Sequence, residues 1–240
     1  MNEQGRGLIQ RNFASHPIGY CAAPFPFPPM ADSEIDDRLE VLEREKATLI
    51  DIRNISGPDG GPIPSLNQGG SSLCWAHSTV TSVLLMRAKA GLPYVPLNAF
   101  GLALQINGFR PNQGGWCQQS VEGAVERGIP SMKTWPFQST SRSNITPAMK
   151  AEQNLYRITE WWDGGDDPRL WWTALALGFA PVSDYNDWGH SVCAVFGNRK
   201  KQTATIMNSW ADTWGKSGLG PPQSRTPHPQ NWMVPRVVTA

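Results

Sequence analysis

Apolar residues recur at helical spacing in four stretches of the chain, and a glycine follows each of the last three. These stretches are residues 33–47, 74–90, 118–127 and 168–177. In the first, Ser33 and Asp36 form a capping-box pattern ahead of a short acidic amphipathic segment. The pattern predicts one acidic helix, whose seven acidic residues within 31–46 form a solvated face, followed by three helices of a main body.

The hydrophobic pattern changes to alternation after residue 190. Residues 191–197 and 203–207 both alternate, and the basic turn 198–201 joins them. The sequence therefore predicts a β-hairpin at this point. Helices that precede strands in this way indicate an α+β fold.

Proline is concentrated near both ends of the chain. Residues 1–30 and 221–240 together hold ten of the 21 prolines and little periodic apolar surface. We expect residues 1–50 to be a Pro-rich arm with the short acidic helix, 51–219 to be the folded body, and 220–240 to be a second arm. If ordered, residues 1–30 and 221–240 are expected to lie extended on neighbouring subunits or other proteins.

Composition and charge narrow the function classes. The 240 residues are 40% hydrophobic and carry 21 basic against 20 acidic groups, a net charge of +1 with no Lys/Arg-rich run. A nucleic-acid partner is therefore not expected. The start of the chain has no apolar signal region, and no stretch approaches 18 apolar residues, so neither secretion by a signal peptide nor a membrane partner is expected. A cytoplasmic or virion-associated location follows as an expectation.

The four cysteines show neither a CxxC pattern nor finger spacing with histidine, so we expect no metal, no cofactor and no disulfide. Cys74 is the best candidate nucleophile, because it follows the Gly/Ser-rich loop 68–73 and begins the longest helix of the body. A helix N-terminus stabilises a thiolate. Cys193 lies within an alternating strand and is expected in the core, whereas Cys21 lies in the arm and Cys117 adjoins a Gly-Gly-Trp turn.

A thiol nucleophile needs a base and an orienting partner for that base. His190 follows Gly189 at the start of an apolar strand, and Asn208 ends the strand predicted to pair with it. Neighbouring strands can bring these two side chains together. His77, one turn beyond Cys74 in the same helix, is expected to pack or to face solvent.

Four stretches resemble the papain-like cysteine peptidases, and they occur in that family's order across about residues 51–219. They are NQGGSSLCWAHS at 67–78, QGGW at 113–116 with a helix and GIP at 128–130, GHSV at 189–192, and NSWADTWG at 208–215. The resemblance implies a two-lobed fold, with a helical lobe that starts at the nucleophile helix and an antiparallel β lobe that carries His and Asn.

The resemblance also implies residue roles. Cys74 would be the nucleophile, His190 the base, Asn208 its orienting partner, and Gln68 an oxyanion-hole donor. The substrate would be a protein or peptide, and the expected substrate-binding residues are Gly114, Gly115, Trp116 and Trp210. Trp210 would cover the bond between His190 and Asn208.

The sequence departs from the family pattern in several places. Ser71 and Asn112 stand where the family has disulfide cysteines, and no stretch resembles a folded pro-domain. The segment from 181 to 190 is short, which predicts a more open cleft, and Pro221-Pro222 stands where a closing strand is expected.

Two other functions stay open at this point. The body could be a scaffold in a virion, tail or other assembly, held by its arms, with Cys74 an inert buried thiol. A transglutaminase-like acyl transfer by the same thiol is a further alternative.

Overall fold

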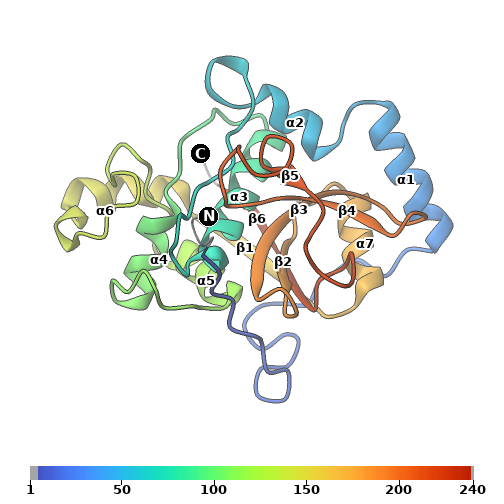
Figure 1. Ribbon diagram of the computed structural model, residues 1–240, viewed down its shortest axis with the longest axis horizontal. Coiled ribbons are helices and arrows are strands. Elements are labelled where there is room, and N and C mark those ends of the chain that lie inside the picture. Colours follow the sequence, from blue (N-terminus) through green and yellow to red (C-terminus); the bar gives the residue numbers. More distant parts are fainter. Residues whose placement is uncertain (1–4, 239–240) are drawn as a thin grey trace.

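The computed structural model describes residues 5–238, with a helical part on one side and a six-stranded sheet on the other (Figure 1). The helices are α1 Asp32–Arg44, α2 Leu49–Ile55, α3 Cys74–Lys89, α4 Ala99–Asn107, α5 Cys117–Glu126, α6 Pro147–Gln153 and α7 Pro168–Ala176, with short 3-10 turns at Pro58–Gly60, Arg142–Asn144 and Asn154–Tyr156. The strands are β1 Ile158–Gly165, β2 Val182–Tyr185, β3 His190–Asn198, β4 Thr203–Met207, β5 Leu219–Gly220 and β6 Asn231–Val238. The α+β prediction is confirmed.

Helix α3 lies at the centre of the molecule and contacts α4 and α5 on one side and β3 and β6 on the other. Apolar or small polar side chains surround it on every side, and only its last two residues are not buried. A helix that is buried all round belongs to a core and not to a surface. The position of α3 therefore fixes its first residue, Cys74, between the two parts of the fold.

The sheet is antiparallel throughout, in the order β1-β6-β2-β3-β4-β5. The predicted hairpin is confirmed as β3 and β4, with Cys193 opposite Met207. Cys193 lies in the core, as expected. Strand β2 joins β3 through a tight connection, so that Tyr185 pairs directly with His190.

The prediction of a C-terminal arm is wrong for the described residues. Strand β6 lies between β1 and β2, and Trp232, Met233 and Val234 are fully buried. Most of the prolines from 221 onward precede this strand in a loop, so they do not interrupt its pairing. The expected boundary at 219/220 falls inside β5. Strand β6 is therefore the closing strand, which begins after Pro221-Pro222.

The N-terminal segment also packs on its own body. Phe25 donates its backbone N–H to Asp163 O in β1, and its ring lies 5.2 Å from Trp232 and 5.8 Å from Trp162. The expectation that 1–30 and 221–240 lie on neighbouring subunits is therefore wrong for 5–30 and 221–238, because this surface covers apolar residues of the same chain. Residues 1–4 and 239–240 lie outside the described part.

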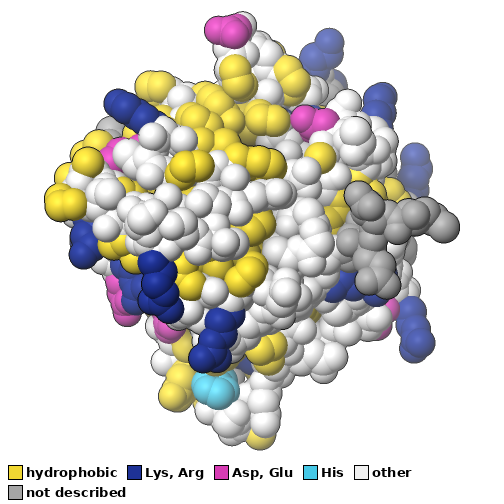
Figure 2. All heavy atoms as spheres, turned by 60° about the vertical axis from the view of Figure 1, so that its left-hand side comes forward, with side chains coloured by type: hydrophobic (Ala, Val, Ile, Leu, Met, Phe, Trp, Pro, Cys, Tyr) yellow, Lys and Arg dark blue, Asp and Glu magenta, His cyan; other side chains and the backbone are white. Residues whose placement is uncertain are grey.

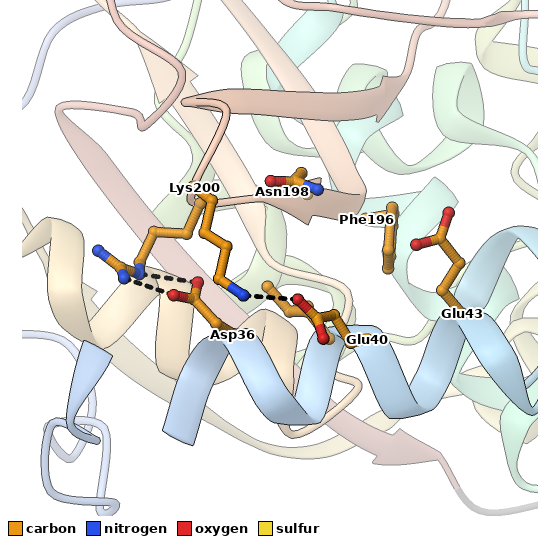
Figure 3. Close-up of a pocket in the computed structure, with 9 residues that line it drawn as sticks. Asp36, Glu40, Glu43, Phe196, Asn198 and Lys200 are labelled. Carbon is orange, nitrogen blue, oxygen red and sulfur yellow. Dashed lines mark hydrogen bonds and ion pairs between the residues drawn. The ribbon is translucent and has the colours of Figure 1, made fainter. Parts of the chain in front are cut away.

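Helix α1 docks on the turn between β3 and β4 through ion pairs (Figure 3). Arg199 contacts Asp36 at 2.6 Å, and Lys200 contacts Glu40 at 2.6 Å. The acidic face of α1 therefore meets the basic turn, although the sequence pattern indicated only a solvated face. The capping prediction is wrong, because the helix begins at Asp32 and its N-cap is Ala31.

The side of the molecule that carries α4 and α6 comes forward in Figure 2. Hydrophobic side chains form several separate patches there, and Lys and Arg side chains stand out singly around the edge. Among residues 5–238, no helix combines the length and the apolar character needed to cross a membrane.

Candidate active site

Cys74 begins α3 directly after a tight loop. In this loop Ser71 donates both its backbone N–H and its hydroxyl to Gln68 O, at 3.1 and 2.7 Å. The Cys74 side chain is fully buried, and the backbone N–H groups of Ser191, Trp75 and Gly7 act on its sulfur to lower its pKa. The β3 strand thus meets the nucleophile candidate one residue after His190.

His190 and Asn208 are brought together by the β3–β4 pairing. His190 Nε2 lies 2.9 Å from Asn208 Oδ1. The indole of Trp210 stacks on the imidazole at 4.6 Å with an interplanar angle of 26°, and the Trp188 ring lies 4.6 Å from it at 63°. The other ring nitrogen, Nδ1, has no hydrogen-bond partner among the described residues.

Gln68 is held in a single orientation. Its Nε2 donates to Ser71 O and to Gly5 O, both at 2.9 Å, and its Oε1 accepts from the Ser209 hydroxyl. Ser209 follows Asn208, so the Gln68 amide and the His190 partner are carried by the same short segment. The amide N–H of Gln68 faces a carbonyl group, as an oxyanion donor must.

The Gly5 carbonyl that accepts from Gln68 belongs to residues 5–9, which we call the strap. Gly5 O also accepts from Trp210 Nε1 at 3.2 Å. Further along the strap, Leu8 N donates to Gly189 O at 3.3 Å, and Ile9 N donates to Gly115 O at 2.8 Å. The chain's own N-terminal segment therefore runs from Gln68 past Cys74 to Gly115.

Glycines allow this close approach. A Cβ at Gly5 would meet Ser71 O at 1.9 Å, and one at Gly7 would meet Ser72 O at 2.2 Å. On the opposite wall, a Cβ at Gly114 would meet Gly7 O at 2.5 Å. Gly115 donates its N–H to Gly7 O at 2.9 Å, and a Cβ there would meet the Trp75 ring. The Gly114–Gly115 pair thus receives an extended backbone, here that of the strap.

Comparisons with known proteins agree with the fold. The chain is 24% identical over 184 residues to Zingipain-2 of Zingiber officinale, which covers 67% of this chain and 81% of that protein. The structure of xylellain, a cysteine protease from Xylella fastidiosa, matches 99% of this chain and 97% of its own with a TM-score of 0.68 and 16% identity. A cysteine protease from Carica candamarcensis matches 72% of this chain and 92% of its own, with a TM-score of 0.57 and 18% identity. No protein-family model matches the chain.

The chain has the fold of these solved cysteine proteases. The four motif stretches of the papain-like pattern surround the cleft that the strap fills.

Burial under the strap determines the protonation states of Cys74 and His190. It raises the pKa of Cys74 to about 12, mainly by desolvation, although three backbone N–H groups act in the opposite direction. Burial also lowers the pKa of His190 to about 4, against the effect of the Asn208 hydrogen bond. With the strap in place, the thiol and the imidazole are therefore both neutral at pH 7.

A second buried thiol lies close to the cleft. Cys117 donates to Asp184 Oδ1 at 2.7 Å and lies 2.8 Å from Ser191 Oγ. Burial, followed by the charge of Asp184, raises the pKa of Cys117 well above its ordinary value. No hydrogen bond is described between Cys117 and His190. The group that accepts the Cys117 hydrogen is therefore the Asp184 carboxylate and not the His190 imidazole.

An open groove of about 360 Å³ continues the cleft beyond the Gly114 ridge. Trp116 forms part of its wall, and the centroids of the Trp116 and His16 rings are 4.6 Å apart in an edge-to-face arrangement. The full lining is Ile9, Ile106, Asn107, Gly108, Arg110, Gln113, Gly114, Trp116 and Gln119. Among the described residues, no group of three or more His, Cys, Asp or Glu side chains could hold a metal ion.

Sequence reasoning missed the strap and the residues behind it. The alternation Gly5-Arg6-Gly7 was a signal, because it offers two side-chain-free backbone positions next to a charged one. Asp184 gave no such signal, since it lies in a short strand with no motif around it. His77 is buried, with Nδ1 2.8 Å from Leu73 O, and so packs as expected.

Proposed function

We propose that the protein is a cysteine endopeptidase that hydrolyses peptide bonds of proteins or peptides with Cys74, His190, Asn208 and Gln68. The observation that carries this proposal is the hydrogen bond between His190 Nε2 and Asn208 Oδ1, which leaves Nδ1 as the free ring nitrogen on the β3 segment that touches the Cys74 sulfur. Cysteine peptidases need such an oriented base beside the thiol.

In the proposed reaction, His190 takes the proton of Cys74, and the thiolate attacks the carbonyl carbon of the scissile bond. The Gln68 amide donates to the oxygen that becomes negative. The imidazolium then gives its proton to the leaving amine. His190 next takes a proton from a water molecule, which attacks the thioester and releases the Cys74 thiol. Asn208 holds the ring orientation through these steps, and Trp210 shields the bond between them.

Hydrolysis requires the strap to leave the cleft, because Gly5 O holds the Gln68 donor and Gly7 covers the sulfur. Once Cys74 and His190 meet water, the desolvation that keeps both neutral is relieved, and the charged pair becomes accessible. Residues 5–9 occupy this cleft, so the strap itself can restrain the activity.

The scaffold alternative loses its support, because its evidence was a pair of free arms. Both segments pack on their own body over the described residues. Association with a virion or another particle has no other observation behind it.

The test uses the full chain with and without Gly7→Ala, which displaces the strap. We expect cleavage of an unstructured protein by the Gly7→Ala variant, complete loss when Cys74→Ala is added, and retention when Cys117→Ala is added instead. Peptide mapping after iodoacetamide treatment should show Cys74 as the fastest-labelled thiol. Absence of cleavage in the folded, strap-displaced chain would overturn the proposal, and loss only with Cys117→Ala would move the nucleophile to the second thiol.

A further inference from the structure

The guanidinium of Arg11 is the most completely satisfied buried charge near the cleft. Its two Nη atoms donate to the two carboxylate oxygens of Asp163 at 2.6 and 2.7 Å, and both side chains are at most 1% exposed. The remaining donors reach Asn231 Oδ1 at 3.2 Å, His16 O at 2.9 Å and Pro17 O at 2.8 Å. All five N–H groups are therefore used, in the fork geometry that distinguishes guanidinium from ammonium.

The site extends behind Asn231 into further acceptors. Asn231 donates its Nδ2 to Asp184 Oδ2 at 2.7 Å and accepts from Gln118 Nε2 at 3.2 Å. Gln118 is fully buried, and its Oε1 has no hydrogen-bond partner within residues 5–238. An unpartnered acceptor of this kind is costly unless an N–H group reaches it. We call Asp163, Asp184, Asn231 and Gln118 together the acidic chamber.

The charges of the acidic chamber require a cation. Asp163 and Asp184 are both buried; Arg11 donates to Asp163 directly and to Asn231, which in turn donates to Asp184. Without Arg11, Asp163 would keep only the backbone N–H groups of Gly19 and Gly165. A buried carboxylate without a counterion is strongly unfavourable, so a chamber left by Arg11 attracts another cation.

The acidic chamber lies directly behind the cleft wall that binds backbone. Arg11 follows Ile9, the strap residue paired with Gly115, by two positions. Cys117 follows Gly115 by two positions and donates to Asp184, and Ser191 follows His190 and contacts the same thiol. A peptide lying along Gly115 therefore passes beside the chamber, as the strap does.

We propose that the acidic chamber is a binding site for an arginine side chain of the peptide substrate, and that Arg11 is its occupant from the same chain. The site then selects peptides that carry an arginine a few residues from the cleaved bond. The same arginine competes with Arg11 and so favours release of the strap. This inference rests on the peptidase activity proposed above.

A first experiment tests the chamber without any hydrolysis. Arg11→Ala removes the side chain beyond Cβ, and ethylguanidinium supplies the missing atoms. Millimolar ethylguanidinium should raise the melting temperature of Arg11→Ala and slow iodoacetamide labelling of Cys74 severalfold, whereas ethylammonium should do neither. In Arg11→Ala/Asp163→Asn, which leaves no unpaired carboxylate at Asp163, the response should vanish. Equal responses to the two cations, or a response that survives in the double variant, would overturn the proposal.

A second experiment tests selectivity with Arg11→Ala and fluorogenic peptides that carry arginine, citrulline, lysine or methionine at one of three positions on either side of the cleaved bond. We expect kcat/KM for arginine at one position to exceed that for citrulline roughly tenfold or more, since citrulline keeps the shape but loses the charge and the donor pattern. Cleavage of all four peptides at equal rates would refute the arginine site and leave the peptidase intact. No cleavage of any peptide would refute the peptidase, while the ethylguanidinium result would still decide the chamber.

Discussion

Displacing the strap should activate the enzyme, and Gly7→Ala is the smallest change that does this. A Cβ at position 7 would lie 2.2 Å from the backbone oxygen of Ser72, which no side-chain adjustment can relieve. Gly7 is not in the left-handed region, so alanine fits its own backbone conformation and the effect comes from the contact alone. The strap must move away from the loop before Cys74.

The size of the effect follows from the contacts that this movement breaks. Gly115 donates to Gly7 O at 2.9 Å, and Ile9 donates to Gly115 O at 2.8 Å. Two such hydrogen bonds contribute about 1–3 kcal/mol net. That loss raises the fraction of molecules in which the strap has left the cleft by about 5- to 150-fold. While this fraction is small, the rates of labelling and hydrolysis rise by the same factor.

The assay compares iodoacetamide labelling of Cys74 and hydrolysis of an unstructured peptide in the native chain and in Gly7→Ala. Gln10→Ala is the matched control, because its side chain is exposed and its described hydrogen bond is a long one of 3.4 Å to Asn186 O. The control should behave as the native chain does. Equal rates for Gly7→Ala and Gln10→Ala, with both proteins folded, would refute the conclusion that the strap restrains the site.

Three further outcomes are expected. In the Gly7→Ala background, Asn208→Ala should lower kcat/KM by roughly 10- to 100-fold because the buried His190 ring loses its partner. In the same background, Gln68→Ala should lower kcat by about 10²–10³-fold. Normal rates in either variant would contradict the role assigned to that residue. Trp232→Ala should lower the free energy of unfolding, measured by urea titration, by about 3–5 kcal/mol because Trp232 is fully buried in β6. The control Gln223→Ala, at an exposed position, should leave it unchanged. A small loss for Trp232→Ala would show that β6 is dispensable. Burial lowers the pKa of His190 from an ordinary 6.5 to about 4, so closure of the strap is fully favoured above pH 6.5 and loses about 1.4 kcal/mol per pH unit as the pH falls towards 4. The melting temperature of the native chain should therefore drop more over this range than that of Gly7→Ala. Parallel curves for the two proteins would argue against this link between His190 and the strap.

Within residues 5–238, local patterns predicted four of the seven α-helices and two of the six strands, and they named the candidate reactive residues. The expected helix 74–90 is α3, and the alternating stretches 191–197 and 203–207 are β3 and β4. Helix periodicity and strand alternation depend on neighbours a few residues away, so one sequence suffices to see them. The hairpin then brings His190 to Asn208 because 18 residues and one turn separate them.

The predictions that failed depended on distant partners. Prolines at both ends indicated free arms, yet β6 lies inside the sheet and residues 5–25 cover the body. Composition describes what a segment can do alone, and it contains no information about a surface elsewhere in the chain that buries it. For the same reason the acidic face of α1 looked solvated, although the turn at Arg199 and Lys200 binds it.

The sequence by itself determined the fold class, the nucleophile helix and the residue types of the candidate site, because each is written in contiguous motifs. The tertiary structure decided what fills that site. Arg11 meets Asp163 across 152 positions and Asn231 across 220, and the strap meets Gly115, which is also distant in the sequence. Contacts of this range arise from the packing of strands and helices, and no local spacing of residues records them.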